Sequence, residues 1–279
     1  MRCRLLPLLL TAVLASTSFA RAESTDYWAA CNSPDFFGVA DACTAIIEAN
    51  AETPNKLAIA YQNRGSIYMA LFGGHAGSAA AIADFDMAIA LNPDYALAYQ
   101  NRGITRAQRG ETTLALKDLT KAMALDPQDA SAALARGFVY GSLGDYRKEI
   151  SDLNISIKLD SKNPDAYYNR GDALAAMGDF DRALSDLDHA IRLLPDDAFY
   201  YFERGKINES ANHFKLAIKD YDMAISFEPE IAAFYVKRGM SKEMLGNTVG
   251  ALEDFKKTLS LSPDPEAAQI ASDGVKRLK

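Results

Sequence analysis

The residues that could carry out chemistry are few and far apart in this sequence. The three histidines, His75, His189 and His213, are too widely separated for any two to share a metal-ligand spacing such as H-x-x-x-H. The sequence contains no C-x-x-C, G-x-S-x-G, G-x-x-x-x-G-K or H-E-x-x-H motif, so it offers no zinc site, serine nucleophile or phosphate-binding loop of these kinds. We therefore expect a protein that is not an enzyme and that holds no metal or cofactor.

Arginine and aspartate recur instead at regular intervals. The aspartates advance by 34 residues at every step, and the arginines do so after a first step of 38 that reflects four extra residues near 73–78: Asp84, Asp118, Asp152, Asp186, Asp220 and Asp254, and Arg64, Arg102, Arg136, Arg170, Arg204 and Arg238. A guanidinium can donate two parallel hydrogen bonds to a carboxylate. We expect a structural ladder of Arg–Asp pairs, formed either within repeats or between neighbouring ones. The alternative, a row of arginines that binds an acidic ligand, is disfavoured because the aspartates keep step.

The unit that positions these residues is seen in residues 164–195. Tyr167, Gly171 and Leu174 lie on one face of a first predicted helix, and Gly178 ends it because glycine adopts the left-handed turn without steric cost. Asp179 is a predicted N-cap for a second amphipathic helix, which Pro195 ends. A hairpin of about thirty residues buries too little apolar surface to be stable alone, so it requires neighbours of its own kind.

The repeated unit resembles the tetratricopeptide repeat. It has an aromatic residue four places before the glycine, a small residue twelve after it, a bulky residue sixteen after it and a terminal proline. Three copies show the pattern most fully: Tyr99, Gly103, Ala115, Leu119, Ala122 and Pro127; Tyr167, Gly171, Ala183, Leu187, Ala190 and Pro195; Tyr201, Gly205, Ala217, Tyr221, Ala224 and Pro229. The copy around Gly137 departs most, with Ala133, Glu149 and Ser156 at these positions, so we expect looser packing there.

The resemblance implies an all-α fold, an α-solenoid of stacked antiparallel helix pairs in a right-handed superhelix. The predicted repeats are 58–95, 96–129, 130–163, 164–197, 198–231 and 232–265. Residues 23–57 are predicted to form a half-repeat cap, and residues 266–279 a C-terminal capping helix, because the ends of a stack have a neighbour on one side only. We expect one elongated domain.

The N-terminus has the pattern of a secretory signal peptide over residues 1–22. Arg2 and Arg4 precede an apolar run too short to span a bilayer, and Ala20-Arg21-Ala22 is typical of a cleavage site. We expect an exported protein, periplasmic in a Gram-negative bacterium and otherwise secreted, with no transmembrane segment in the mature chain. In that oxidising setting Cys31 and Cys43 are predicted to form a disulfide bond.

The charge balance also limits the possible partners. The formal net charge is −7, and removal of three arginines with residues 1–22 makes it −10. Nucleic acids and anionic membranes require clustered basic residues, so neither is an expected partner.

Binding in this family takes place in the concave groove, and the resemblance implies a protein or peptide partner there. The stripe one residue beyond the packing face supplies the predicted groove: Gln100, Ile104, Leu134, Phe138, Tyr168, Asp172, Phe202, Lys206, Val236 and Met240. The lysine and asparagine of the family's carboxylate clamp are missing from it, which disfavours chaperone tails. Flanking helices or a second copy could also cover the groove.

We therefore expect a non-catalytic scaffold that binds a protein or peptide in its groove. One alternative is a structural subunit of a cell-envelope assembly that uses the outer face or the ends. A less favoured one is a small-ligand or glycan-binding module, for which the patch of Tyr168, Asp172, Phe202 and Lys206 is the nearest candidate.

Overall fold

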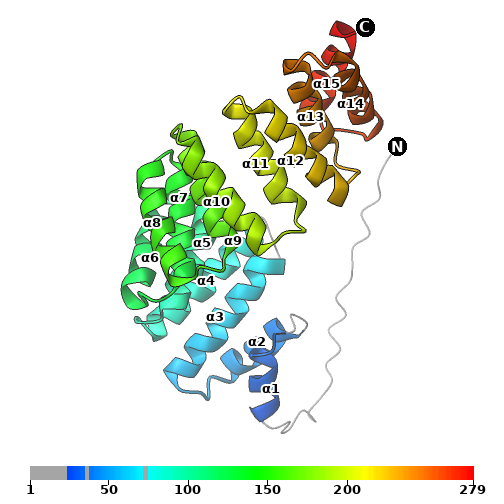
Figure 1. Cartoon of the computed structure of the whole chain (residues 1–279). Helices are drawn as coiled ribbons and strands as arrows, with labels where there is room; N and C mark the ends of the chain where they lie inside the picture. The colour runs from blue at the N-terminus through cyan, green and yellow to red at the C-terminus, as the bar shows by residue number, and fades with distance from the viewer. Residues whose placement is uncertain (1–23, 35–37, 72–74) are drawn as a thin grey trace, which may run out of the picture. The chain divides into compact units, whose positions relative to one another are not determined.

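The computed structural model of the protein describes residues 24–34, 38–71 and 75–279. These residues form fifteen α-helices and no β-strand, which confirms the predicted all-α fold of packed helix pairs (Figure 1). The predicted signal peptide lies outside the described residues. Within them, no helix combines the length and the apolar character that crossing a bilayer requires.

Contacts divide the chain into two compact units, one ending at Asn92 and the other beginning at Pro93, where a single domain was expected. The helices of the first unit each pack on the next: α1 (Ser24–Cys31), α2 (Val39–Ala49), α3 (Pro54–Leu71) and α4 (His75–Leu91). The second unit contains α5 (Ala96–Gln108), α6 (Thr112–Leu125), α7 (Ala130–Ser142), α8 (Tyr146–Leu159), α9 (Pro164–Ala176), α10 (Phe180–Leu193), α11 (Ala198–Ser210), α12 (Phe214–Phe227), α13 (Ala232–Met244), α14 (Thr248–Ser260) and α15 (Pro265–Arg277).

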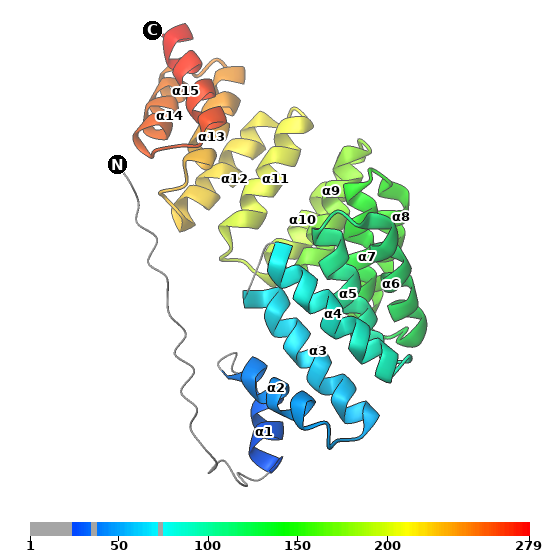
Figure 2. The ribbon, with the colours of Figure 1, turned by 180° about the vertical axis from the view of Figure 1, so that it is seen from behind.

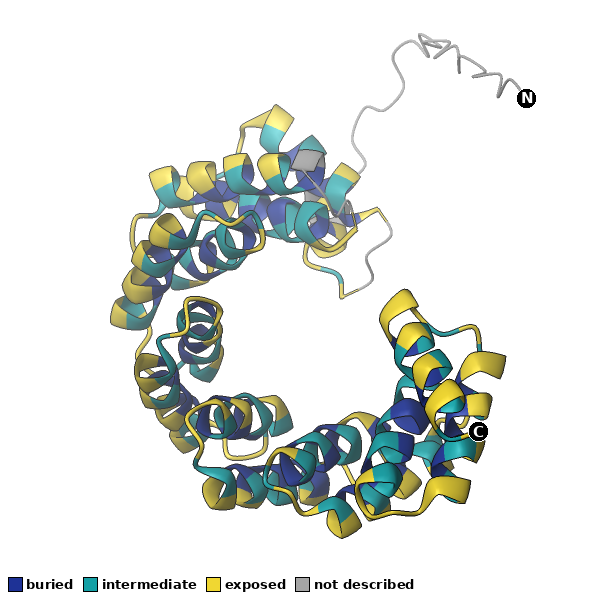
Figure 3. Ribbon diagram, turned by 90° about the horizontal axis from the view of Figure 1, so that it is seen from above, coloured by how far each residue is buried: buried dark blue, intermediate teal, exposed yellow. Residues whose placement is uncertain are grey.

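The second unit is a stack of helix pairs, each joined by a short turn (Figure 2). The predicted repeats 96–129, 130–163, 164–197, 198–231 and 232–265 each hold one pair. Every first helix also contacts the first helix of the next pair, whereas successive second helices within this unit make no such contact. The first helices α5, α7, α9, α11 and α13 therefore line one side, which we call the inner face. Figure 3 shows buried residues where consecutive helices meet and exposed ones at the turns.

The turns within the pairs follow from residues that favour them. Gly178 ends α9 in the left-handed conformation, with φ 83°, as the sequence predicted. Asn212, one of the few other residue types that tolerate this conformation, fills the corresponding turn with φ 61°. The predicted N-cap Asp179 accepts a hydrogen bond from the backbone N–H of Arg182 at the start of α10. These local signals set where each helix ends.

Each pair is held together by a close approach between its two helices. A β-carbon at Gly171 of α9 would lie 2.5 Å from Leu187 Cδ2 on α10, and one at Gly205 would lie 2.5 Å from the ring of Tyr221. At Gly137 the corresponding distance, to Leu153 Cγ, is 3.3 Å. The repeat that departs most from the sequence pattern is therefore also the least tightly apposed.

The arginines and aspartates form the pairs expected of a ladder. Each arginine donates from Nε and Nη2 to the aspartate on the second helix of its own repeat; for Arg170 and Asp186 the distances are 2.8 and 2.7 Å. The six pairs are Arg64–Asp84, Arg102–Asp118, Arg136–Asp152, Arg170–Asp186, Arg204–Asp220 and Arg238–Asp254. The aspartates are buried and the guanidinium groups are largely buried, so the pairs belong to the packing between helices.

The same arginines also link neighbouring repeats. Nη1 of Arg204 donates to Asp188, which lies on the second helix of the preceding repeat, at 2.6 Å, and Arg238 reaches Asp222 in the same way. Thr120 and Asn154 accept the equivalent bonds from Arg136 and Arg170. The pairing within repeats and the linkage between repeats therefore use different nitrogens of one side chain.

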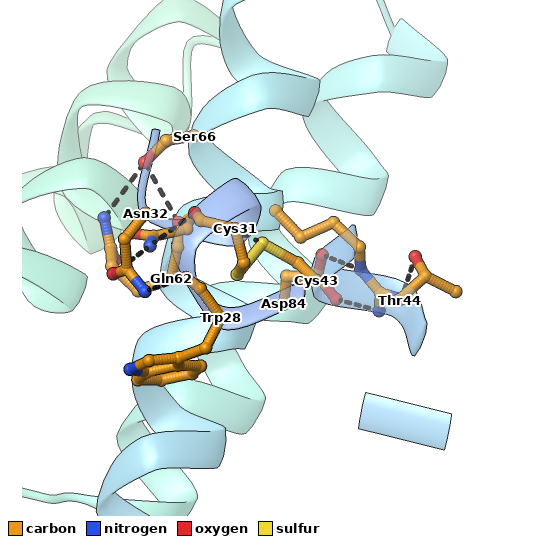
Figure 4. The surroundings of a disulfide bond; sticks show 10 residues. Trp28, Cys31, Asn32, Cys43, Thr44, Gln62, Ser66 and Asp84 are labelled. Carbon is orange, nitrogen blue, oxygen red and sulfur yellow. Dashed lines mark hydrogen bonds and ion pairs between the residues drawn. A yellow bond between two sulfur atoms is a disulfide. The ribbon is translucent and has the colours of Figure 1, made fainter. Parts of the chain in front are cut away.

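A disulfide bond joins α1 to α2 in the first unit, between Cys31 and Cys43 (Figure 4). Both cysteines are fully buried in a cluster with Val39, Ile46 and Leu57. Nη1 of Arg64 donates to Thr44 of α2, so Thr44 occupies the place that Thr120 takes in a later repeat.

The C-terminal end of the stack is covered by α15. Ala267 and Ala271 of this helix pack against Val236 of α13 and Phe255 of α14. The pair of hydrogen bonds from Arg277 to Glu243 on α13, each 2.7 Å long, fixes its far end. This helix therefore buries apolar side chains that would otherwise end the stack exposed.

Candidate ligand groove

The predicted groove residues lie on the inner face with unequal exposure. Phe138 is 62% exposed, and Asp172 is also exposed. Six others are half-buried: Ile104, Leu134, Tyr168, Phe202, Lys206 and Met240. The remaining two, Gln100 and Val236, are buried.

Val236 was expected to be exposed, and that expectation was wrong; Gln100 is buried as well, but it still lines the groove. Gln100 donates a 2.6 Å hydrogen bond to Ser131 Oγ on α7, which turns its side chain into the contact between two first helices. Val236 is covered by Ala267 and Ala271 of α15, and Met240 packs against the same cluster. The last repeat therefore uses its predicted groove positions to hold the C-terminal cap.

A hollow of about 500 Å³ lies on the inner face of the second unit. Four successive first helices supply its apolar walls: Ile104 and Ala107 from α5, Leu134 and Phe138 from α7, Tyr168 from α9 and Phe199 from α11. Polar groups come from Gln100, Gln108, Ser131, Asp165 and Asn169. We call this cavity the hollow. Its volume lies within the range of pockets that bind small ligands.

Aromatic packing fixes one wall of the hollow. Tyr168 meets Phe199 edge-on, with ring centroids 4.8 Å apart, and both rings also meet Tyr200 edge-on. Tyr200 donates a 2.8 Å hydrogen bond to Asp165 at the start of α9. Sequence reasoning missed Phe199, because it lies in the first turn of α11 and outside the stripe used to predict the groove.

The predicted small-ligand patch is not assembled into one cavity. Phe202 packs against Phe234 and Tyr221, with ring centroids 4.9 and 5.7 Å away, and Lys206 pairs with Glu203 at 2.8 Å. Neither Phe202 nor Lys206 lines the hollow, whereas Tyr168 does.

Glu149 of α8 is an unusual residue beneath this part of the inner face. It occupies a position that is a buried alanine in the other repeats, and it is only 7% exposed. Both carboxylate oxygens lie 2.6 Å from where a β-carbon of Gly141 on α7 would be. Burial, and repulsion from the charge of Asp172 on α9, raise the pKa of Glu149 to about 7.

His189 and His213 lie in separate surroundings and do not form a common site. The ring of His189 stacks on Tyr167 at 4.3 Å and accepts a hydrogen bond from Arg192, while His213 is exposed at a turn. The side chain of His75 lies outside what the structure describes. Across the described residues, no three histidine, cysteine, aspartate or glutamate side chains come together as a metal site.

Comparison with known families gives a consistent answer. Two family models, both described as tetratricopeptide repeat, match residues 77–139 and 164–197. The chain is a tetratricopeptide repeat protein. Comparison with curated protein sequences finds no significant match.

Solved structures of other tetratricopeptide repeat proteins have a similar backbone. MamA is 26% identical, with a TM-score of 0.56 over 61% of this chain and 92% of MamA. YrrB, described as having an unusual peptide-binding site, is 24% identical, with a TM-score of 0.56 over 68% of this chain and 97% of YrrB. A tetratricopeptide repeat protein from Parabacteroides merdae is 20% identical, with a TM-score of 0.63 over 91% and 95%. The likenesses to YrrB and to the Parabacteroides merdae protein show a shared fold and nothing more.

Proposed function

We propose that this tetratricopeptide repeat protein is a non-catalytic scaffold that binds a peptide segment of a partner protein on the inner face of its second unit. The observation that carries the proposal is the hollow, whose apolar walls come from four successive first helices. Exposed apolar surface of this kind is typical of a binding site. Partner binding is expected to depend on a few aromatic anchors, chiefly Phe138 and Tyr168.

The shape of the site favours a chain segment as ligand. Successive first helices in a stack lie about 10 Å apart, so an extended peptide that crosses them meets a new helix every three residues or so. The likeness to MamA and other repeat proteins supports the more general part of this proposal, that the chain is a scaffold for protein interactions.

Site-specific photocrosslinking would test this proposal. A photoreactive phenylalanine analogue placed at Phe138 is expected to capture a partner, whereas the same analogue at the exposed Met223 of α12, on a second helix, is expected to capture none. The captured partner is then purified and its affinity measured. Phe138→Ala should weaken binding at least about tenfold while leaving the helical circular dichroism unchanged, because the side chain is mostly exposed. Capture from Met223 alone, or an unchanged affinity, would overturn the proposal.

We also propose that the chain is exported. The signal-peptide pattern at residues 1–22 supports this, and so does the disulfide between two fully buried cysteines, because disulfides persist in oxidising compartments. Fractionation of cells that express the full chain, followed by N-terminal sequencing, should find a mature chain that begins at Glu23. An unprocessed chain in the cytosol, with free thiols, would refute export.

A second candidate function, a structural subunit of an envelope assembly, is favoured by one feature at the turn between α13 and α14. Met244 and Val249 are 64% and 69% exposed there, and Leu245 lies between them. If Met244→Ser and Val249→Ser abolish incorporation into a larger complex while Phe138→Ala does not, a structural role in an assembly would replace peptide binding as the proposed function.

A further inference from the structure

Some carboxylates on or beneath the inner face form an ion pair with a lysine or arginine, and others do not. Glu203 pairs with Lys206, Glu209 lies 3.4 Å from Lys237, and Glu243 is held by Arg277. These three belong to α11 and α13. Glu149 and Asp172, below and on the part of the inner face formed by α7 and α9, have no ion pair or hydrogen bond from a side chain of the described residues.

The described surroundings of Glu149 leave room for a carboxylate but supply no cation to neutralise it. Five other repeats carry a fully buried alanine at its position: Ala81, Ala115, Ala183, Ala217 and Ala251. Any side chain at Gly141 would collide with the carboxylate oxygens, so Gly141 leaves the space that Glu149 occupies. A buried acid without a partner costs stability, and such groups concentrate at functional sites.

Three of the positive charges on the helices packed around Glu149 are already engaged, and the other two on α8, Arg147 and Lys158, are exposed. On α7, Arg136 is held by Asp152 and Thr120, and on α9, Arg170 is held by Asp186 and Asn154. On α8 itself, Lys148 pairs with Asp145 and lies over the ring of Tyr140. The charge that acts on the pKa of Glu149 is that of Asp172, which is also negative. Glu149 and Asp172 therefore repel each other when both are ionised, and a bound cation would relieve this repulsion.

We propose that Glu149 and Asp172 form an anchor for a lysine or arginine side chain of the peptide that the hollow binds. Tyr168 links the two features, since it lines the hollow and Asp172 lies one helical turn further along the same face of α9. A basic side chain would enter beside Asp172, the exposed member, and its charge would stabilise ionised Glu149 below. The neighbouring apolar side chain of the same peptide would fill the hollow against Phe138. The ligand class is thus a peptide with a basic residue next to an apolar one.

This inference rests on the proposed peptide binding, and the experiment separates the two. An array of random twelve-residue peptides is probed with the intact chain, and each bound peptide is resynthesised with its lysines replaced by norleucine and its arginines by citrulline. We expect the bound set to be rich in basic residues and the replacements to weaken binding about tenfold. Glu149→Gln should weaken binding of the basic peptide by a similar factor and leave the neutral version unchanged.

The pH dependence supplies a readout that a structural role would not change. A bound cation favours the ionised acid, so affinity for the basic peptide should rise several-fold between pH 6 and pH 8. The norleucine peptide, and the Glu149→Gln variant with either peptide, should show no such rise. Asp172→Asn should weaken the basic peptide without removing the pH dependence.

The outcomes are distinct. Peptides that bind, that require Phe138 and that are indifferent to both norleucine replacement and Glu149→Gln would overturn the basic anchor while leaving the proposed function in place. An array without any binder, or with binders indifferent to Phe138→Ala, would overturn the proposed function and the anchor with it.

Discussion

Leu187 of α10 lies so close to the backbone of Gly171 on α9 that a β-carbon there would come within 2.5 Å of Leu187 Cδ2. In the preceding repeat the same relationship between Leu153 and Gly137 leaves 3.3 Å. Gly171 and Gly137 occupy the same position in their repeats, but the two helices of the pair lie closer together at Gly171. Their comparison therefore measures how much of the stability of the stack comes from this close approach.

We expect Gly171→Ala to destabilise the protein by about 2 kcal/mol, because the added methyl group forces the two helices apart. Gly137→Ala should change the free energy of unfolding by less than about 1 kcal/mol, since its clash is milder and alanine favours the helix. Urea denaturation of both variants checks this. Equal losses would show that the glycines act through something other than distance between helices.

The two carboxylates that Arg204 contacts should contribute unequally. Asp220 is buried and also accepts a hydrogen bond from Asn208, so Asp220→Ala leaves Nε and Nη2 of Arg204 and the amide of Asn208 without their acceptor and is expected to cost about 3 kcal/mol. The side chain of Asp188 is 49% exposed, so Asp188→Ala should cost less than about 1 kcal/mol. Denaturation curves decide between them, and a larger loss from Asp188→Ala would mean that linkage between repeats dominates.

Reduction of the Cys31–Cys43 disulfide should loosen the first unit. A bridge that closes a loop of this length restricts the unfolded chain by about 3 kcal/mol. Hydrogen exchange before and after reduction should show faster exchange in α1 and α2 and unchanged protection in α9 and α10. The Cys31→Ala, Cys43→Ala variant, which cannot be oxidised, is the control. Unchanged protection of α1 after reduction would contradict the prediction.

The free energy of unfolding should decrease as the pH rises, because of Glu149. Its pKa is about 7 in the folded chain and about 4.3 when unfolded, so the unfolded state loses its proton first. The stabilising effect is complete below about pH 4 and is lost as pH rises through about 7. The full shift corresponds to about 4 kcal/mol, and we expect about 1 to 2 kcal/mol because water reaches the inner face.

Glu149→Gln removes the titrating group and keeps its shape. The loss of unfolding free energy between pH 5 and pH 8 should therefore be smaller in this variant than in the parent chain. Identical pH profiles would show that other groups cause the decline.

Much of the fold was predictable because its signals are local or periodic. The helix end at Gly178 and the cap at Asp179 depend on residues within one turn of the chain. The approach at Gly171 and the pairing of Arg170 with Asp186 depend on a spacing of sixteen residues that recurs from repeat to repeat. A repeated contact leaves a repeated pattern, so the sequence exposes it.

The candidate site was less predictable, because it depends on particular side chains in particular repeats. Gln100 lines the hollow, as its place in the stripe predicts, but its amide donates to Ser131 on the next first helix and its side chain is buried. Val236 fits the stripe too, and α15 covers it. Phe199 lines the hollow from outside the stripe.

The sequence by itself therefore determined the helix pairs, their repeat length and the types of residue that meet between them, since these follow from local conformation and a fixed period. Only the tertiary structure decided which nitrogen of each arginine serves its own repeat and which the preceding one. It also decided which groove positions stay open and that Glu149 lies against Gly141 without a partner. These depend on how each pair is placed against the next, which sums many weak contacts between residues far apart in the chain.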